Sequence, residues 1–131
     1  MQVIFDADSL IQYLAGKEPA ATKIEAFIQM QDSRIRILDV VLIKVIETLS
    51  GKHKVPKDII CDNVEGLIHN SHVSCNNTLL LNTLIFYRDS NINIVTAYVS
   101  AAVHMQGLRL YTFDKEFKKV HTIKDWLDYH H

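Results

Sequence analysis

The sequence has few of the residues that build flexible linkers, disulfide frameworks or zinc sites. Its 131 residues include 4 Gly, 2 Pro and 2 Cys. So few glycines and prolines argue against a long linker, and we expect one domain over residues 1–131. The two cysteines form no Cys-x-x-Cys pair, so we expect reduced thiols in place of a disulfide or a zinc site.

Long apolar runs and an excess of one charge are also missing. No apolar stretch is long enough to span a membrane, and the first residues carry no positive charge before Asp6, so we expect no signal peptide and a cytoplasmic protein. The formal net charge of −1 excludes binding of nucleic acid by bulk charge. Any such contact must come from a local basic patch or through metal ions.

A Gly-rich phosphate loop and a Gly-x-Ser-x-Gly elbow are absent, which argues against a nucleotide-triphosphate enzyme and gives no sign of that type of serine nucleophile.

Short apolar segments alternate with segments of helical periodicity. We expect strands over residues 3–5, 34–38, 73–75 and 108–113, and helices over residues 9–14, 20–30, 40–49, 58–69, 78–88 and 94–106. At the end of the chain we expect a short edge strand over residues 120–122 and one helical turn over residues 124–129. Strands that alternate with helices predict an α/β fold with three layers, α/β/α, and a mainly parallel central sheet.

Carboxylates follow two of the predicted strands. Asp6 comes directly after residues 3–5, and Asp114 directly after residues 110–113. In parallel sheets ligands bind beyond the carboxyl ends of the strands, so both residues lie where a site is expected. The alternative for each is an aspartate that caps a loop.

A third carboxylate lies in a very apolar predicted helix. Glu47 has almost only apolar neighbours, and the alternative reading is a surface pair with Lys44. Three carboxylates that converge repel one another, and hard cations such as Mg²⁺ or Mn²⁺ relieve that repulsion through oxygen ligands. Such ions bind a phosphodiester and activate a water molecule.

Three segments resemble the motifs of PIN domains, in the same order and spacing. Residues 3–11 resemble the opening strand that ends in a metal-binding Asp, residues 40–51 the hydrophobic helix with one Glu near its end, and residues 107–117 the closing motif in which Thr-x-Asp precedes a Phe. The resemblance implies a PIN-like fold and an endoribonuclease that cuts single-stranded RNA. It also implies that Asp6, Glu47 and Asp114 hold Mg²⁺ or Mn²⁺.

One position departs from the PIN pattern. Family members carry a third acid in the first turn of the helix that leads to the Gly107 equivalent, and here Thr96 falls at that place. Threonine is neutral and a weak direct ligand of Mg²⁺, so the site should lose one negative charge and some metal affinity. Asp8 adds a carboxylate two residues after Asp6, and it either faces the metal or caps the following helix.

The densest basic stretch follows the Glu47 helix. It consists of Lys52, His53, Lys54 and Lys57, and it either contacts a nucleic-acid backbone or is a solvated loop. Lys115, Lys118 and Lys119 flank Asp114 with the same two readings.

Three functions fit these features. The first is a metal-dependent endoribonuclease whose small size resembles the toxin of a toxin–antitoxin pair, which implies a homodimer and a small antitoxin partner. The second is a degenerate PIN domain that binds RNA or protein without cutting, motivated by Thr96. The third is a phosphatase of the haloacid dehalogenase type, because Asp6-Ala7-Asp8 resembles its Asp-x-Asp opening.

Overall fold

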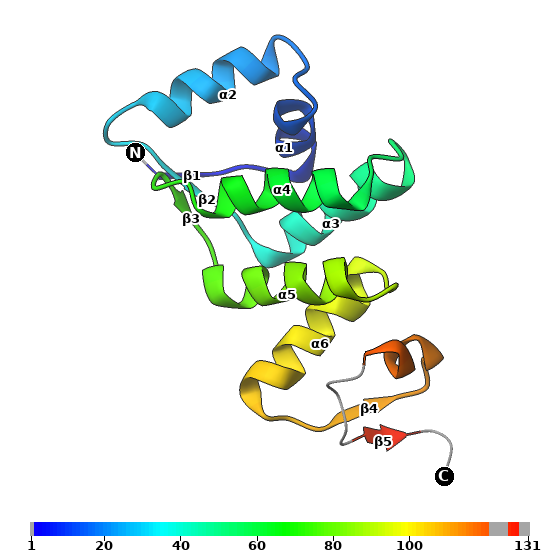
Figure 1. The fold of residues 1–131 in the computed structure, drawn as a ribbon. Helices are drawn as coiled ribbons and strands as arrows, with labels where there is room; N and C mark the ends of the chain where they lie inside the picture. Colours follow the sequence, from blue (N-terminus) through cyan, green and yellow to red (C-terminus); the bar gives the residue numbers. More distant parts are fainter. Residues whose placement is uncertain (1, 121–125, 129–131) are drawn as a thin grey trace. The chain divides into compact units, whose positions relative to one another are not determined.

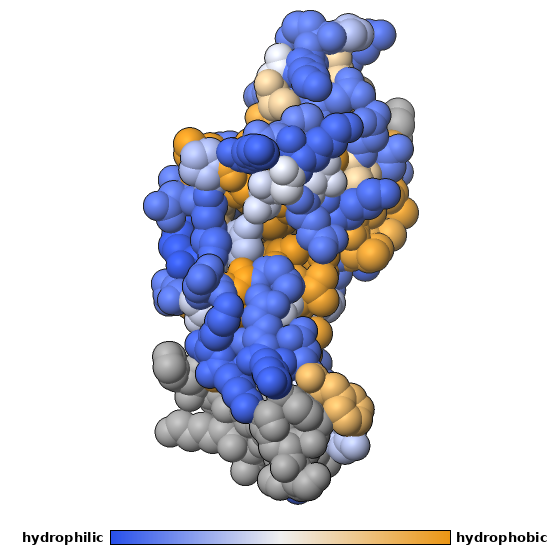
Figure 2. Space-filling view, turned by 90° about the vertical axis from the view of Figure 1, so that its right-hand side faces the viewer, coloured by the Kyte–Doolittle hydropathy of each residue, from blue (hydrophilic) through white to orange (hydrophobic). Residues whose placement is uncertain are grey.

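A computed structural model describes residues 2–120 and 126–128 of the chain (Figure 1). It divides into two compact units, Met1–Asn77 and Thr78–His131. Within the described residues no helix is long and apolar enough to cross a membrane. On the face that Figure 2 shows, hydrophilic residues cover most of the surface and hydrophobic residues show between them.

Unit 1 places two helices after each of its first two strands. Its elements are β1 (Gln2–Ile4), α1 (Ala7–Leu14), α2 (Ala20–Gln29), β2 (Arg34–Arg36), α3 (Asp39–Gly51), α4 (Lys57–Ile68) and β3 (Val73–Ser74). The strands are short, so most of the unit's core comes from helices. Helix α1 packs against α2 and α3, and α3 packs against α4.

The three strands of unit 1 form a parallel sheet in the order β1-β2-β3. Ile4 lies opposite Arg36 in β2, and Arg36 lies opposite Ser74 in β3. Because the strands are parallel and in this register, the segments that follow them leave the sheet at one edge. The carboxyl ends of all three strands therefore meet at the same edge, where the sequence places Asp6.

Branched aliphatic side chains fill the core of unit 1. They come from one strand and three helices, and the most buried are Leu10, Ile35, Leu42, Val45, Ile46, Ile60, Val64 and Ile68. Each such side chain stabilises the fold by roughly 1.5–3 kcal/mol relative to an exposed one. This core fixes α1 and α3, the helices that carry Asp8 and Glu47.

Unit 2 consists of two helices followed by a small parallel sheet. Its elements are α5 (Asn77–Asp89), which begins at the last residue of unit 1, α6 (Ile94–Gln106), β4 (Leu110–Thr112), the 3-10 helix η1 (Lys115–Lys119) and β5 (Trp126–Asp128). Strand β4 pairs in parallel with β5, with Tyr111 opposite Leu127. Helix α6 contacts η1.

Most predicted elements are confirmed within a few residues, and the chain is an α/β protein with parallel strand pairs. The prediction of a helical turn over residues 124–129 is wrong for its described part. Trp126–Asp128 is a strand, because it pairs with β4 and tertiary pairing overrides a weak local helical signal. In the predicted edge strand, Val120 caps η1, and residues 121 and 122 lie outside the described residues. The described strands lie in two sheets, where the sequence predicted one.

Candidate functional site

Asp6 stands two residues beyond the end of β1 and begins the next helix. The apolar strand ends there because Asp6 is the N-cap of α1: its Oδ1 accepts a hydrogen bond from the Ser9 backbone N–H at 2.9 Å. The side chain is exposed. Hydrogen bonds from the backbone and side chain of Ser9 lower the pKa of Asp6, because they favour the charged form. One carboxylate oxygen of Asp6 therefore caps the helix, as the alternative reading expected. The second oxygen can accept a hydrogen bond from another group or bind a cation.

The two other candidate acids of unit 1, Asp8 and Glu47, occupy separate places. Asp8 lies inside the first turn of α1, and its Oδ2 accepts a hydrogen bond from Gln12 Nε2 at 2.8 Å, so it does not cap the helix. Glu47 is exposed on α3. Among the described residues Glu47 forms no hydrogen bond, and no ion pair joins it to Lys44, so the alternative of a surface pair is not found.

A cavity of about 600 Å³ lies at the carboxyl edge of β2 and β3. Its lining consists of the residues that leave these two strands, Arg36, Ile37, Leu38, Asp39, Val40, Cys75 and Asn76. By the strand register, Asp6, Leu38 and Asn76 occupy equivalent positions two residues beyond the paired set Ile4, Arg36 and Ser74. Asp6 does not line the cavity, but it belongs to the same edge of the sheet.

Cys75 is the thiol that lines this cavity, and its surroundings favour the protonated form. Its pKa is raised, first by burial and then by the nearby Asp39 carboxylate, while Arg36 opposes the shift. The Cys75 Sγ–H donates to Asn77 Oδ1 at 3.1 Å. Both cysteines are free, as the sequence predicted. A raised pKa disfavours the thiolate, so the geometry gives Cys75 no support as a nucleophile.

Asp114 occupies in unit 2 the place that Asp6 has in unit 1. It follows a parallel strand, is exposed, and caps a helix: its Oδ1 accepts from the Glu116 backbone N–H at 2.9 Å. The Asp114 N–H donates to Thr112 Oγ1 at 2.9 Å. This bond gives the Thr-x-Asp spacing a physical role, since the buried threonine fixes the backbone at the residue that presents the carboxylate.

Thr96 lies in the first turn of α6, as the sequence predicted. Its N–H donates to the N-cap side chain, Asn93 Oδ1, at 2.9 Å. Thr96 is only 2% exposed. A carboxylate at this buried position would need a cation or hydrogen bonds to compensate it, and threonine removes that requirement.

The carboxylate that reaches the start of α6 comes from Glu116, which the sequence analysis did not identify. Glu116 Oε1 accepts from the Asn93 backbone N–H at 2.6 Å, and Oε2 accepts from Asn93 Nδ2 at 2.7 Å. We call this pair the Asn93–Glu116 clamp. It joins the N-terminus of α6 to η1, and thereby couples the turn that contains Thr96 to the segment that begins at Asp114. Its only sequence signal is an Asn in a capping position and an acid two residues after Asp114.

The chemical type of these side chains suits a hard divalent cation, because all are oxygen donors. Their placement gives no complete ligand set within one unit. Asp6, Asp8 and Glu47 lie in unit 1, and Thr96 and Asp114 lie in unit 2. In the part of the chain that the structure describes, neither unit by itself gathers three His, Cys, Asp or Glu side chains that could hold a metal ion.

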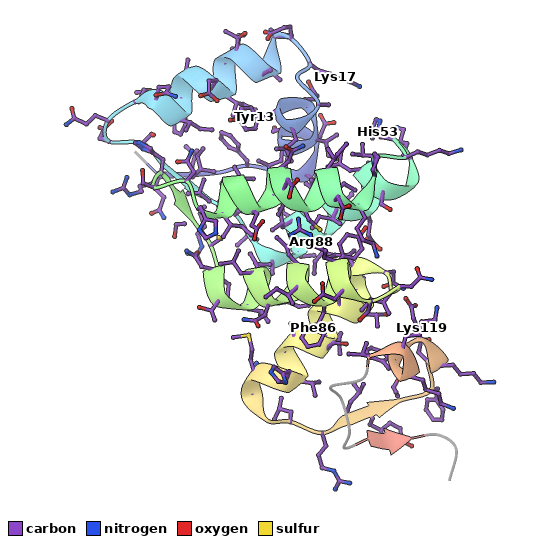
Figure 3. All side chains as sticks on the ribbon, viewed as in Figure 1. Tyr13, Lys17, His53, Phe86, Arg88 and Lys119 are labelled. Atoms are coloured by element: carbon purple, nitrogen blue, oxygen red, sulfur yellow. The ribbon has the colours of Figure 1, made fainter. Side chains whose placement is uncertain are left out.

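The predicted basic stretch is a loop between α3 and α4, where Figure 3 labels His53. Lys52, His53 and Lys54 are exposed, and Lys54 has a positive φ of 52°. Lys57 is half-buried and begins α4. The exposure of Lys52, His53 and Lys54 fits both earlier readings, a contact with a nucleic-acid backbone and a solvated loop.

Comparison with known proteins leaves the family open. No family model matches the chain, and no curated protein matches it. Among solved structures, a toxin–antitoxin complex from Klebsiella pneumoniae is similar to 95% of this chain over 95% of its own chain, with 15% sequence identity and a TM-score of 0.35. A TM-score this low does not establish a shared fold.

Proposed function

We propose that this chain is a PIN-like endoribonuclease that cuts single-stranded RNA with the help of Mg²⁺ or Mn²⁺ held by Asp6, Glu47 and Asp114. The observation that carries the proposal is the shared position of Asp6 and Asp114. Each is an exposed carboxylate that stands two residues beyond a parallel strand and caps the next helix through one oxygen. The order and spacing of the three sequence motifs support the same reading, and the proposal includes a three-layer α/β/α arrangement.

Each residue has a defined task in this proposal. A bound divalent ion would supply a polarised water and stabilise the leaving oxygen of a phosphodiester. The hydrogen bonds from Ser9 lower the pKa of Asp6 and so favour the charged form, which is the form that binds a cation. Glu47 offers an exposed carboxylate from a helix that a packed core holds in place. Thr96 adds no charge, so we expect weak metal binding and activity that needs millimolar Mn²⁺.

Cleavage of a labelled single-stranded RNA tests the proposal. Wild type, Asp6→Asn and Asp114→Asn are incubated with Mn²⁺ or EDTA, beside Asp62→Asn as a matched control in an exposed carboxylate of α4. We expect Mn²⁺-dependent cleavage by wild type and the control, and a loss of roughly 10²–10³-fold in both site variants, as for the removal of one charge-stabilising group. Equal, metal-independent cleavage by all four proteins would exclude the nuclease.

The buried Thr96 favours a second function, a PIN-like module that binds RNA without cutting it. In that case wild type binds RNA and shows no cleavage above the Asp6→Asn background. The Thr96→Asp variant separates the two functions, because the new carboxylate at a 2% exposed position needs a cation. If the missing acid limits the enzyme, Thr96→Asp unfolds more easily than wild type in EDTA, regains stability with Mn²⁺ and cuts faster. Unchanged activity and no Mn²⁺-dependent gain in melting temperature contradict this reading of Thr96.

The proposed nuclease would act as the toxin of a toxin–antitoxin pair, as a homodimer that a small antitoxin protein neutralises. The basis is the small size of the chain together with its PIN-like motifs. Induced expression in a bacterial host should arrest growth for wild type and not for Asp6→Asn. Growth that continues unchanged with wild type at the same protein level contradicts the toxin role, while cleavage of RNA in vitro would still stand.

A further inference from the structure

Strand β4 presents its aromatic residues to solvent. Leu110 and Thr112 are each 8% exposed, whereas Tyr111 is 65% exposed and Phe113, which follows the strand, is 70% exposed. Alternate residues of a strand point to opposite faces, so the two aromatic side chains share the outer one. Their ring centroids lie 5.6 Å apart at an interplanar angle of 78°. Together they form one exposed aromatic surface.

Exposed aromatic side chains offer apolar area that a ligand can cover. An aromatic side chain buries about 150–250 Å² when it is packed, and adjacent large apolar groups on a soluble protein commonly mark a site of interaction. Thr112, between the two rings, points inward and holds the Asp114 backbone. The aromatic pair therefore belongs to the segment that leads directly into Asp114, the carboxylate that the proposed nuclease needs.

Basic residues flank the aromatic pair in the sequence, although the chain as a whole has a net charge of −1. Between residues 109 and 119 the basic residues are Arg109, Lys115, Lys118 and Lys119, and the acidic ones are Asp114 and Glu116. The Glu116 carboxylate is engaged by Asn93. Arg109 and Lys115 are exposed, and Lys119 Nζ donates to Asn91 O at 3.3 Å, close to the start of α6 (Figure 3). Residues 109–119 are therefore a second local basic segment, in addition to the loop that contains Lys52, His53 and Lys54.

We propose that the outer surface of Arg109, Tyr111, Phe113 and Lys115 binds unpaired nucleotides, with bases stacked on the two rings and phosphates beside the two cations. The inference rests on the proposed function for its choice of RNA as the strand. Aromatic faces between cations suit a polyanion whose bases are exposed, which is the chemistry of single-strand recognition. A duplex hides its base faces and offers nothing to the rings.

The orientation of the rings adds a geometric constraint. The two ring planes lie at 78° to each other, with centroids 5.6 Å apart. Stacked bases are parallel, so two bases that stack on the two rings cannot also stack on each other. The surface accordingly selects an unstacked segment of RNA.

Binding without cleavage tests the surface independently of the enzyme. Fluorescence anisotropy measures the affinity of a fluorescein-labelled single-stranded RNA of mixed sequence in EDTA, for wild type, Tyr111→Ala and Phe113→Ala. Two further variants separate stacking from packing: Tyr111→Phe keeps the flat ring, and Phe113→Leu keeps apolar volume without a ring. We expect each loss of a ring to weaken binding roughly 5- to 100-fold, as for one stacked base. Tyr111→Phe should retain the wild-type affinity.

The salt dependence of the RNA affinity distinguishes a phosphate contact from a purely structural role, because a structural role leaves the slope unchanged. Arg109→Gln and Lys115→Gln should each reduce the slope of log affinity against log salt by about 0.7, the value for one phosphate contact on a single strand. A duplex of the same sequence should bind more weakly than the single strand. The inference is overturned if wild type, Phe113→Leu and the two cation variants bind RNA with equal affinity. It is also overturned if the rings are needed for a shift from monomer to dimer, because a second copy of the chain then covers them.

The outcomes for the surface and for the enzyme are separable. If Asp6→Asn abolishes cleavage while the ring and cation variants bind RNA like wild type, the surface is refuted and the nuclease stands. If the ring variants lose RNA binding while wild type shows no Mn²⁺-dependent cleavage, the nuclease is refuted and the surface stands as a binding site. If the alanine variants do not fold, Tyr111→Phe against Phe113→Leu still decides whether a flat ring is required.

Discussion

The Asn93–Glu116 clamp allows a quantitative prediction about unit 2. Glu116 accepts two hydrogen bonds from Asn93, at 2.6 and 2.7 Å, while Asn93 itself caps α6 through Thr96 N–H. Hydrogen bonds to charged groups contribute roughly 1.5–3 kcal/mol each when they are buried. Glu116 is only half-buried, so we expect about 2 kcal/mol of unfolding free energy to be lost in Glu116→Ala.

A double-mutant cycle isolates the side-chain bond of the clamp. Asn93→Ser keeps an oxygen that can cap α6 and removes the Nδ2 donor, so we expect a loss of about 1 kcal/mol. The double variant should be little worse than Glu116→Ala alone, which gives a coupling of about 1 kcal/mol. Urea unfolding and amide hydrogen exchange at Asn93 and Thr96 measure these values. Losses that add to within about 0.3 kcal/mol would show that the side-chain bond of the clamp does not form in solution.

Three further predictions concern single positions. Ser100 Oγ is buried without a hydrogen-bond partner among the described residues, so Ser100→Ala should raise the free energy of unfolding by roughly 1 kcal/mol in urea denaturation; a loss of that size would mean that the hydroxyl has a partner. Gly107 ends α6 with a φ of 62°, so Gly107→Ala should lower the melting temperature through a strain of roughly 1–2 kcal/mol, and an unchanged value would rule out the left-handed cap. Tyr13, which Figure 3 labels between α1 and α2, has a pKa raised to about 12. The first cause is burial, and the second is the hydrogen bond that its hydroxyl donates to Glu25. Because the folded-state pKa lies above the unfolded value near 10, the stability that Tyr13 contributes is complete below pH 10 and is lost between about pH 10 and 12. Tyr13→Phe should lose less stability over this range, and identical pH profiles would refute the shift.

Helix α6 shows what the sequence can predict about this fold. The predicted range of residues 94–106 matches the observed helix Ile94–Gln106, because both ends have local signals. Asn93 supplies a capping oxygen and Gly107 tolerates a left-handed backbone conformation. Where ends lack such signals, as in β2, the predicted strand was longer than the observed one, Arg34–Arg36.

Pairing between distant segments is what the sequence did not predict. Trp126–Asp128 forms a strand because β4 offers a partner, and no local pattern in the tail indicates this. The same holds for the division of the strands into two sheets. Local periodicity measures the preference of one segment, whereas a sheet depends on the edge that another segment leaves open.

The candidate site divides in the same way. The strand-end positions of Asp6 and Asp114 follow from the alternation of strands and helices, and the place of Thr96 follows from the start of α6. The role of Glu116 does not follow, because its partner Asn93 is 23 residues away. For Asp8 the sequence allowed a cap, and the structure instead places it one turn from Gln12.

Binding of Mn²⁺ tests the central claim most directly, since the proposed nuclease stands on Asp6, Glu47 and Asp114 as ligands of one ion. Isothermal titration with Mn²⁺ compares wild type with Asp6→Asn, Glu47→Gln and Asp114→Asn, and with Asp62→Asn as the control. We expect wild type and the control to bind with the same affinity, and each of the three site variants to bind roughly tenfold or more weakly. Equal Mn²⁺ affinity in all five proteins, or no binding by wild type at millimolar Mn²⁺, would contradict the account.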